Sequence, residues 1–124
     1  MRALVIDDSK VMRSILCNML KKLGYETTEA GDGKAALEVL GPPGQFDLAM
    51  VDWNMPEMNG FEFLLAVRAD PERADLRIVM VTTETETYQM TRALAAGANE
   101  YVMKPFSREV LAEKLSLLLA TAAV

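Results

Sequence analysis

The sequence predicts an α/β fold in which a doubly wound parallel sheet of five strands is enclosed by five helices. Short apolar runs alternate with amphipathic segments along the whole chain, which is the pattern of repeated strand–helix units. Three runs, ALVI, LAMV and IVMV, lack the polar alternation of a half-exposed strand, so they indicate strands covered on both faces. The length of 124 residues suits one core, and we expect a single domain over residues 1–124 with no output domain attached.

The first strand is predicted over residues 2–7, and Asp8 or Ser9 is suited to cap the helix that follows it. A helix of this kind buries one apolar face. The predicted face consists of apolar residues spaced four apart, Val11, Ile15, Met19 and Leu23. Two lysines and then Gly24 are typical of a helix C-terminus, so the helix should end there.

An edge strand and the central strand come next. Residues 25–30 are more polar than the other predicted strands, which favours a place at the edge of the sheet. A Gly-Asp-Gly turn leads into a short helix over residues 34–40, and the sequence GPPG stops that helix. Residues 46–52 are almost continuously apolar and are predicted to form the central strand.

The second half of the chain repeats the same unit. After a turn that contains Pro56 and an Asn-Gly pair, residues 61–69 are predicted to be helical. The apolar residues available for packing there are Phe61, Leu64, Leu65 and Val67. A strand over residues 77–82 follows.

The last strand and two helices complete the predicted fold. Thr83 and Glu86 fit a capping box at the start of a helix that Gly97 would end. A strand over residues 99–103 then leads through a Lys-Pro turn into a final amphipathic helix over residues 110–120.

Polar groups stand where the apolar runs end. Asp7 and Asp8 stand at the end of the first predicted strand, Asp52 at the end of the third, Thr82 at the end of the fourth and Lys104 directly after the fifth. Ligands of doubly wound sheets bind outside the carboxyl ends of the strands. We therefore expect these side chains to converge on one small anionic site, with Asp52 as its reactive centre.

The chemistry of such a site follows from its charges. Two unit charges 4 Å apart repel by about 1 kcal/mol in water and by about 4 kcal/mol at an intermediate dielectric. A divalent cation bound by oxygen ligands, most simply Mg²⁺, would relieve the repulsion among three carboxylates. A carboxylate beside Mg²⁺ and an ammonium group is placed to attack a phosphoryl group and form an aspartyl phosphate. Lys104 and Thr82 would contact the transferring oxygens.

Composition excludes several classes of function. The chain has no histidine, which rules out Ser-His-Asp and Cys-His catalysis and histidine-based metal sites. Its single cysteine, Cys17, cannot form an internal disulfide, and the first residues make a poor secretory signal, so we expect a cytoplasmic protein. The net charge of -5 argues against nucleic-acid binding. No apolar run reaches the roughly 20 residues that cross a membrane.

In these residues the chain resembles the receiver domain of two-component response regulators. The resemblance covers the whole chain. It rests on Asp7-Asp8, Asp52, Thr82 and Lys104-Pro105, each at the end of a predicted strand. Within that family, the segments DWNMP and KPF together with Tyr101 are most similar to the single-domain chemotaxis regulators. The resemblance implies a flavodoxin-like fold with strand order 2-1-3-4-5 and a cis Lys104–Pro105 peptide bond.

The resemblance also implies a role for each site residue. Asp52 would accept a phosphoryl group from a histidine kinase of the chemotaxis type. The ligands of Mg²⁺ would be Asp8, Asp52, the backbone carbonyl of Asn54 and, through water, Asp7. Thr82 and Lys104 would bind the phosphoryl oxygens. The protein would catalyse only its own phosphorylation and dephosphorylation and would not be an enzyme in the usual sense.

The output would follow from a local rearrangement. Thr82 would move toward the phosphate and let Tyr101 turn inward, which would change partner binding on the face of the fourth helix, fifth strand and fifth helix. The implied partners are a flagellar motor switch protein or a phosphatase, and we expect a monomer. Asn54 and Glu84 are placed to influence attack of water on the aspartyl phosphate.

Two other functions remain open at this point. A phosphorelay intermediate or scaffold receiver would use the same site and drive no motor. A Mg²⁺-dependent phosphatase or mutase with an aspartyl-phosphate intermediate needs a second acid two residues after the nucleophile. Asn54 stands at that position, which disfavours such an enzyme.

Overall fold

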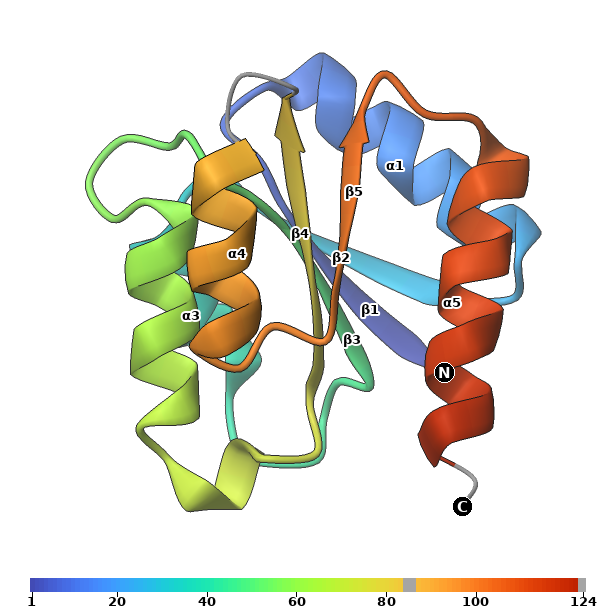
Figure 1. Ribbon diagram of the computed structural model, residues 1–124. Helices are drawn as coiled ribbons and strands as arrows, with labels where there is room; N and C mark the ends of the chain where they lie inside the picture. Colours follow the sequence, from blue (N-terminus) through green and yellow to red (C-terminus); the bar gives the residue numbers. More distant parts are fainter. Residues whose placement is uncertain (84–86, 123–124) are drawn as a thin grey trace.

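The computed structural model describes residues 1–83 and 87–122 and shows a parallel sheet between two layers of helices (Figure 1). The strands are β1 (Arg2–Ile6), β2 (Glu26–Ala30), β3 (Leu48–Asp52), β4 (Arg77–Thr83) and β5 (Glu100–Lys104). Their order in the sheet is β2-β1-β3-β4-β5, and every neighbouring pair is parallel. The predicted fold class and the implied strand order are both confirmed.

Helices cover both faces of this sheet. On one face lie α1 (Lys10–Lys22) and α5 (Arg108–Ala122), and on the other lie α2 (Gly33–Leu40), α3 (Gly60–Arg68) and α4 (Thr87–Ala95) (Figure 1). A short 3-10 helix, η1 (Pro71–Arg73), joins α3 to β4. In the described part of the chain, no helix is long and apolar enough to cross a membrane.

The central strand β3 places Asp52 at the edge of the core. All five residues of β3 are buried. Successive side chains of a strand point to opposite faces, so Ala49 and Val51 pack toward α2, α3 and α4, whereas Leu48 and Met50 pack toward α1 and α5. The apolar run therefore fills both halves of the core and delivers one carboxylate to the carboxyl edge of the sheet.

The apolar face predicted for α1 is wrong in its first half. Val11 and Ile15 are 70% and 43% exposed, whereas Leu16, Cys17 and Leu20 are buried against the sheet. An α-helix has 3.6 residues per turn, so a row of residues spaced four apart turns by about 40° at each step. The row that begins at Val11 therefore packs against the core only through its last two members.

The predicted face of α3 also needs a correction. Leu65 is 46% exposed, and Phe63, which the prediction omitted, is fully buried. The helix contacts the sheet through Phe63, Leu64 and Val67. Leu65 follows Leu64 by about 100° around the helix axis, which turns its side chain toward solvent.

The start of α3 differs from its prediction as well. The helix begins at Gly60 with a capping box, in which the Glu62 amide donates to Asn59 Oδ1 at 2.8 Å and the Asn59 amide donates to Glu62 Oε1 at 3.0 Å. The prediction assigned the Asn-Gly pair to a turn. The capping box predicted for α4 lies outside the described residues, because it involves Glu86 and the side chain of Thr83.

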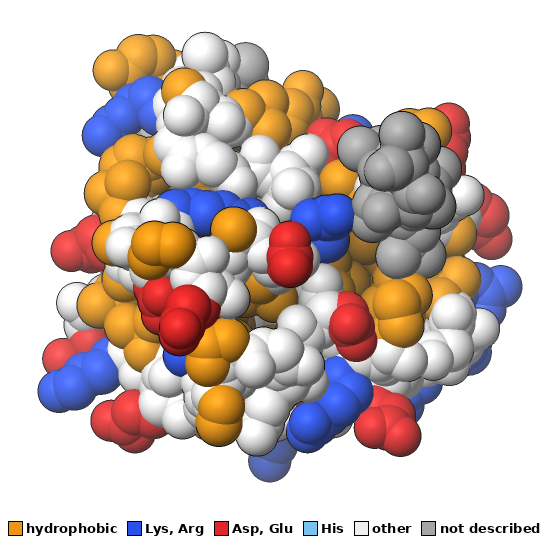
Figure 2. All heavy atoms as spheres, turned by 90° about the horizontal axis from the view of Figure 1, so that it is seen from below, with side chains coloured by type: hydrophobic (Ala, Val, Ile, Leu, Met, Phe, Trp, Pro, Cys, Tyr) orange, Lys and Arg blue, Asp and Glu red, His pale blue; other side chains and the backbone are white. Residues whose placement is uncertain are grey.

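The end of the molecule opposite the carboxyl ends of the strands carries mixed charges. Acidic and basic side chains are interspersed there (Figure 2). In η1, at this end, Arg73 pairs with Asp70 at 3.4 Å and donates to the carbonyl oxygen of Gly41 at 2.6 Å. Neither sign of charge dominates this surface.

Candidate functional site

Three aspartates lie together at the carboxyl edge of the sheet. Asp7 follows β1 directly, and Asp52 ends β3. Because these strands are neighbours, with Ile6 paired to Val51, their next residues lie side by side, and Asp8 follows in the adjoining loop. One carboxylate oxygen from each aspartate lies within 4.8 Å of the others. Asp7 and Asp52 are 1% and 8% exposed, whereas Asp8 is open to solvent.

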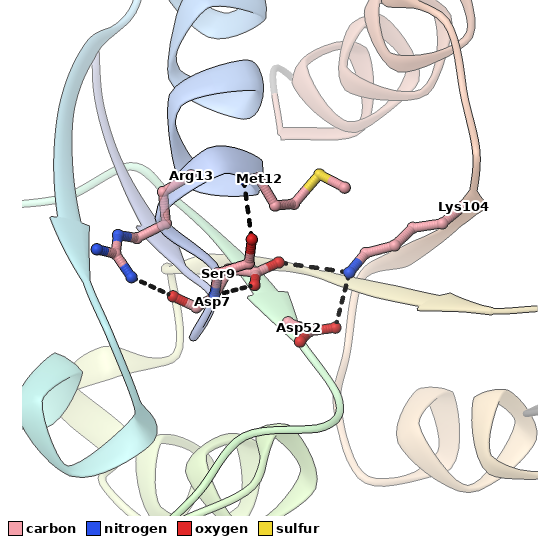
Figure 3. A network of polar contacts seen from close by, with 6 residues as sticks. All are labelled: Asp7, Ser9, Met12, Arg13, Asp52 and Lys104. Atoms are coloured by element: carbon pink, nitrogen blue, oxygen red, sulfur yellow. Dashed lines mark hydrogen bonds and ion pairs between the residues drawn. The ribbon is translucent and has the colours of Figure 1, made fainter.

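Lys104 reaches this cluster across β4. Its Nζ lies 3.1 Å from Asp52 Oδ1 and 3.4 Å from Asp7 Oδ2 (Figure 3). Since β4 separates β5 from β3, the long lysine side chain spans one strand to make both contacts. The Lys104–Pro105 peptide bond is cis, as the resemblance implied. The structure thus joins the ammonium of Lys104 to two of the three carboxylates, those of Asp7 and Asp52.

The electrostatics of the cluster are dominated by negative charge. Burial and the neighbouring Asp7 carboxylate raise the pKa of Asp52 from 3.8 to about 6, and the ammonium of Lys104 offsets only part of this effect. Burial alone would lower the pKa of Lys104, but Asp52 and Asp7 outweigh it and raise that pKa. The three carboxylates therefore outnumber the one ammonium, and the cluster carries an excess of negative charge.

A hard divalent cation fits this arrangement. The side-chain ligand atoms are carboxylate oxygens, which Mg²⁺ prefers, and they lie within reach of one another. A surface hollow lined by Asp8, Asn54, Met55, Pro56 and Asn59 adjoins the cluster. Such a hollow leaves room for the waters that Mg²⁺ keeps when it binds a protein.

Thr82 lies on β4 beside the cluster, and Tyr101 lies on the neighbouring strand β5. Thr82 is one residue beyond Val81, which pairs with Asp52, and it is 1% exposed. Tyr101 pairs with Met80, two residues before Thr82. Residues two apart on a strand point to the same face, so Thr82 and Tyr101 are diagonal neighbours on the face covered by α4.

Three predicted site residues remain. Tyr101 and Asn54 are described by the structure, and Glu84 is not. The Tyr101 ring is half-buried, and Lys114 Nζ lies 5.0 Å from its centroid while pairing with Glu100 at 3.4 Å. Asn54 is exposed beside the hollow. Glu84 lies outside the described residues.

Gly60 is a site residue that the sequence analysis missed. Its amide donates to the carbonyl oxygen of Trp53 at 2.9 Å, and a Cβ on it would collide with the backbone oxygen of Asp52. The close approach lets α3 begin directly beneath the end of β3. The capping box at Asn59 and Glu62 was the local signal that could have placed a helix start, and hence this contact, here.

Arg13 makes a second contact that was not predicted from the sequence, a hydrogen bond to Asp7. Its Nη1 donates to the backbone oxygen of Asp7 at 2.7 Å (Figure 3). No local pattern indicates this bond, because it depends on how α1 folds back over the end of β1.

Comparison with known proteins gives three findings. The response regulator receiver domain family matches residues 3–116. The chain is 45% identical over 122 residues to chemotaxis protein CheY1 of Helicobacter pylori, covering 98% of each chain, and 47% identical over 116 residues to chemotaxis protein CheY of Pseudomonas aeruginosa, covering 93% of each. The solved structure of chemotaxis protein CheY4 of Vibrio cholerae superposes with a TM-score of 0.84 at 37% identity, covering 94% of this chain and 96% of that one.

Proposed function

The chain belongs to the family of response regulator receiver domains, and we propose that it switches partner binding by accepting a phosphoryl group on Asp52 from a histidine kinase. It is a signalling protein rather than a true enzyme. The observation that carries the proposal is the buried Asp52 carboxylate, held 3.1 Å from the ammonium of Lys104 and beside two further aspartates.

Asp52 acts as the nucleophile. One of its carboxylate oxygens forms a bond to phosphorus while the bond from phosphorus to the imidazole nitrogen of the kinase breaks, and the imidazole leaves with the electron pair. With a pKa of about 6, Asp52 is mostly ionised at neutral pH and available for attack. Lys104 then turns its N–H groups from the carboxylate to a phosphoryl oxygen, and the hydroxyl of Thr82 donates to another.

The metal site of the proposal uses the same edge of the sheet. Asp8, Asp52 and the backbone carbonyl of Asn54 would hold Mg²⁺, with the Asp7 carboxylate beside them. The cation supplies positive charge to the oxygens of the transferring phosphoryl group when it is bound. The close carboxylates and the raised pKa of Asp52 support this assignment.

The output surface is the face formed by α4, β5 and α5. Tyr88, Met103 and Val110 on this face are 76%, 40% and 41% exposed. They give a partner apolar contacts beside Tyr101, whose diagonal position to Thr82 supports its role in the switch. Movement of Thr82 toward the phosphoryl group makes room for Tyr101 to turn inward and changes this face.

The names of the relatives favour a role in chemotaxis for this chain. Its curated relatives from Helicobacter pylori and Pseudomonas aeruginosa are named chemotaxis proteins and match along nearly their whole length. The kinase is accordingly of the chemotaxis type, and the downstream partner is a flagellar motor switch protein or a phosphatase. A phosphorelay role would instead show as onward transfer of the phosphoryl group to a histidine phosphotransfer protein.

Transfer from a radiolabelled, autophosphorylated chemotaxis-type histidine kinase tests the proposal. We expect label to move to the wild-type protein in the presence of Mg²⁺ and then to appear as inorganic phosphate, whereas Asp52→Asn takes up none. In Asn54→Arg the label should persist several-fold longer, because a long cationic side chain beside the hollow hinders the approach and activation of water. Label that stays on the kinase, or that reaches Asp52→Asn equally, would refute the proposed function. Unchanged decay in Asn54→Arg would refute the role of Asn54 alone.

A further inference from the structure

Arg13 makes two hydrogen bonds, and the proposed function assigns no role to either of them. It lies in the second turn of α1, and its side chain is 18% exposed. Nη1 donates to the backbone oxygen of Asp7 at 2.7 Å, and Nε donates to Glu29 Oε1 on β2 at 3.0 Å. One guanidinium thus joins α1, the end of β1 and the edge strand.

The bond to Asp7 acts on the peptide group that leads to Asp8. The carbonyl of Asp7 and the amide of Asp8 share one planar peptide unit, so a donor that fixes the carbonyl also fixes the direction in which the chain enters Asp8. The other groups of Asp7 are held as well. Its amide donates to Ala30 at 3.2 Å, and its Oδ1 accepts the Ser9 amide at 2.9 Å. Arg13 supplies the remaining restraint, on the side of Asp8.

Asp8 has the least support of the three carboxylates. It is exposed, whereas Asp7 and Asp52 are buried and both contact Lys104. Its position relative to the other two carboxylates therefore depends on the backbone that precedes it. Groups that orient metal ligands commonly change metal affinity by about 10- to 100-fold when they are removed.

We propose that Arg13 is a positioning residue for the metal site, acting through the Asp7–Asp8 peptide rather than through its charge. This inference rests on the proposed function, since it assumes that the three aspartates bind Mg²⁺. Glu29 contributes by holding the guanidinium in place.

Arg13 could act on the site through its charge or through the position of Asp8, and these two roles predict opposite changes in Mg²⁺ affinity when Arg13 is removed. Removing a cation near three carboxylates would leave more negative charge and tighten the binding of Mg²⁺. Removing a restraint on Asp8 would weaken it, because binding would then also have to order the loop. The direction of the change in affinity separates the two explanations.

The chain contains a matched control for the structural effect of losing an arginine. Arg73 is 19% exposed, donates to one backbone carbonyl oxygen and pairs with one carboxylate, as Arg13 does. It lies in η1 at the opposite end of the sheet, far from the aspartates. Arg13→Met and Arg73→Met therefore remove similar interactions, but only the first touches the site.

The experiment is a titration of the full chain with MgCl₂, followed by the amide NMR shifts of Asp8 and Asn54, for the wild type and both variants. We expect Arg13→Met to raise the dissociation constant about tenfold. Arg73→Met should bind as the wild type does, and urea unfolding should show a similar stability loss in both. Glu29→Gln should give a smaller loss of affinity, because Arg13 can still reach Asp7.

Any of the following results would overturn the positioning role of Arg13. Equal or tighter binding by Arg13→Met, or an equal loss in Arg73→Met, would overturn the positioning role and leave the proposed function intact. Failure of the wild type to bind Mg²⁺ would overturn the metal site and the positioning role together. Should Arg13→Met not fold, Arg13→Lys serves in its place. A single ammonium cannot reproduce the two-armed contact, so weaker binding is again expected.

Discussion

Asp52→Asn is expected to stabilise the metal-free protein by about 1–3 kcal/mol at about pH 8, while it removes the proposed phosphoryl acceptor. The reason is that the native environment disfavours the ionised carboxylate, since burial and Asp7 raise its pKa from 3.8 to about 6. Asparagine fills nearly the same volume without the charge. The residue proposed to carry the function is thus expected to cost stability in the resting protein.

The sign of the pH dependence follows from the same shift. The native state holds the Asp52 proton more tightly than the unfolded state does, so this proton stabilises the wild type below about pH 4 and the stabilisation is lost as the pH rises through about 6. The advantage of Asp52→Asn should therefore be full above about pH 6 and should shrink toward about pH 4.

Urea unfolding in the presence of a chelator, repeated across this pH range, measures the effect. Asp75→Asn is the control, because Asp75 is exposed and lies outside the cluster. It should show no comparable gain. Added Mg²⁺ should stabilise the wild type and narrow the difference in stability, because the proposed metal site exists only in the native state. An Asp52→Asn variant no more stable than the wild type at high pH would contradict the account of the site's electrostatics.

Gly60→Ala is expected to lower both stability and the rate of phosphorylation. A Cβ at this position would collide with the backbone oxygen of Asp52 and would lie 3.0 Å from Trp53 Cα and from Met80 Cε. Two of these neighbours are backbone, so the end of β3 or the start of α3 must shift. Overpacking of this kind costs about 1–3 kcal/mol. A displaced nucleophile can lose on the order of a hundredfold in rate.

The matched control for this variant is Gly31→Ala. Gly31 lacks a positive φ, and its added Cβ would meet only Arg13 Nη1 at an ordinary distance of 3.7 Å. Gly60 also lacks a positive φ. The two variants therefore differ in the steric conflict that the added Cβ causes, and neither places alanine in the left-handed region. Urea unfolding gives the stability, and the rate of phosphorylation by acetyl phosphate gives the effect on the site. Wild-type behaviour of Gly60→Ala in both assays would mean that α3 does not constrain Asp52.

The strand ends were predictable from the sequence because burial and topology both act on them. A short, continuous apolar run such as residues 48–51 between turns indicates a strand covered on both faces, whose end lies at the edge of the sheet. Parallel strands share that edge, so Asp7, Asp52 and Lys104 were expected to meet before their distances were known.

The contacts around the site could not be predicted in the same way. Whether Val11 or Leu16 faces the sheet depends on the rotation of α1, which a spacing of four residues leaves undefined. The bond from Arg13 to Asp7 and the approach of Gly60 to Asp52 depend on how helices dock on the sheet. Both are long-range consequences of packing; the capping box at Asn59 and Glu62 marks where α3 starts, but no local pattern marks the bond from Arg13 to Asp7.

The most direct test of the central claim is the intact mass of the protein after incubation with acetyl phosphate, with Mg²⁺ or with a chelator, beside Asp52→Asn. We expect the added mass of one phosphoryl group only for the wild type with Mg²⁺, and peptide mapping should place it on Asp52. No adduct after rapid acid quenching, or an adduct that persists in Asp52→Asn, would contradict the assignment of Asp52 as the phosphoryl acceptor.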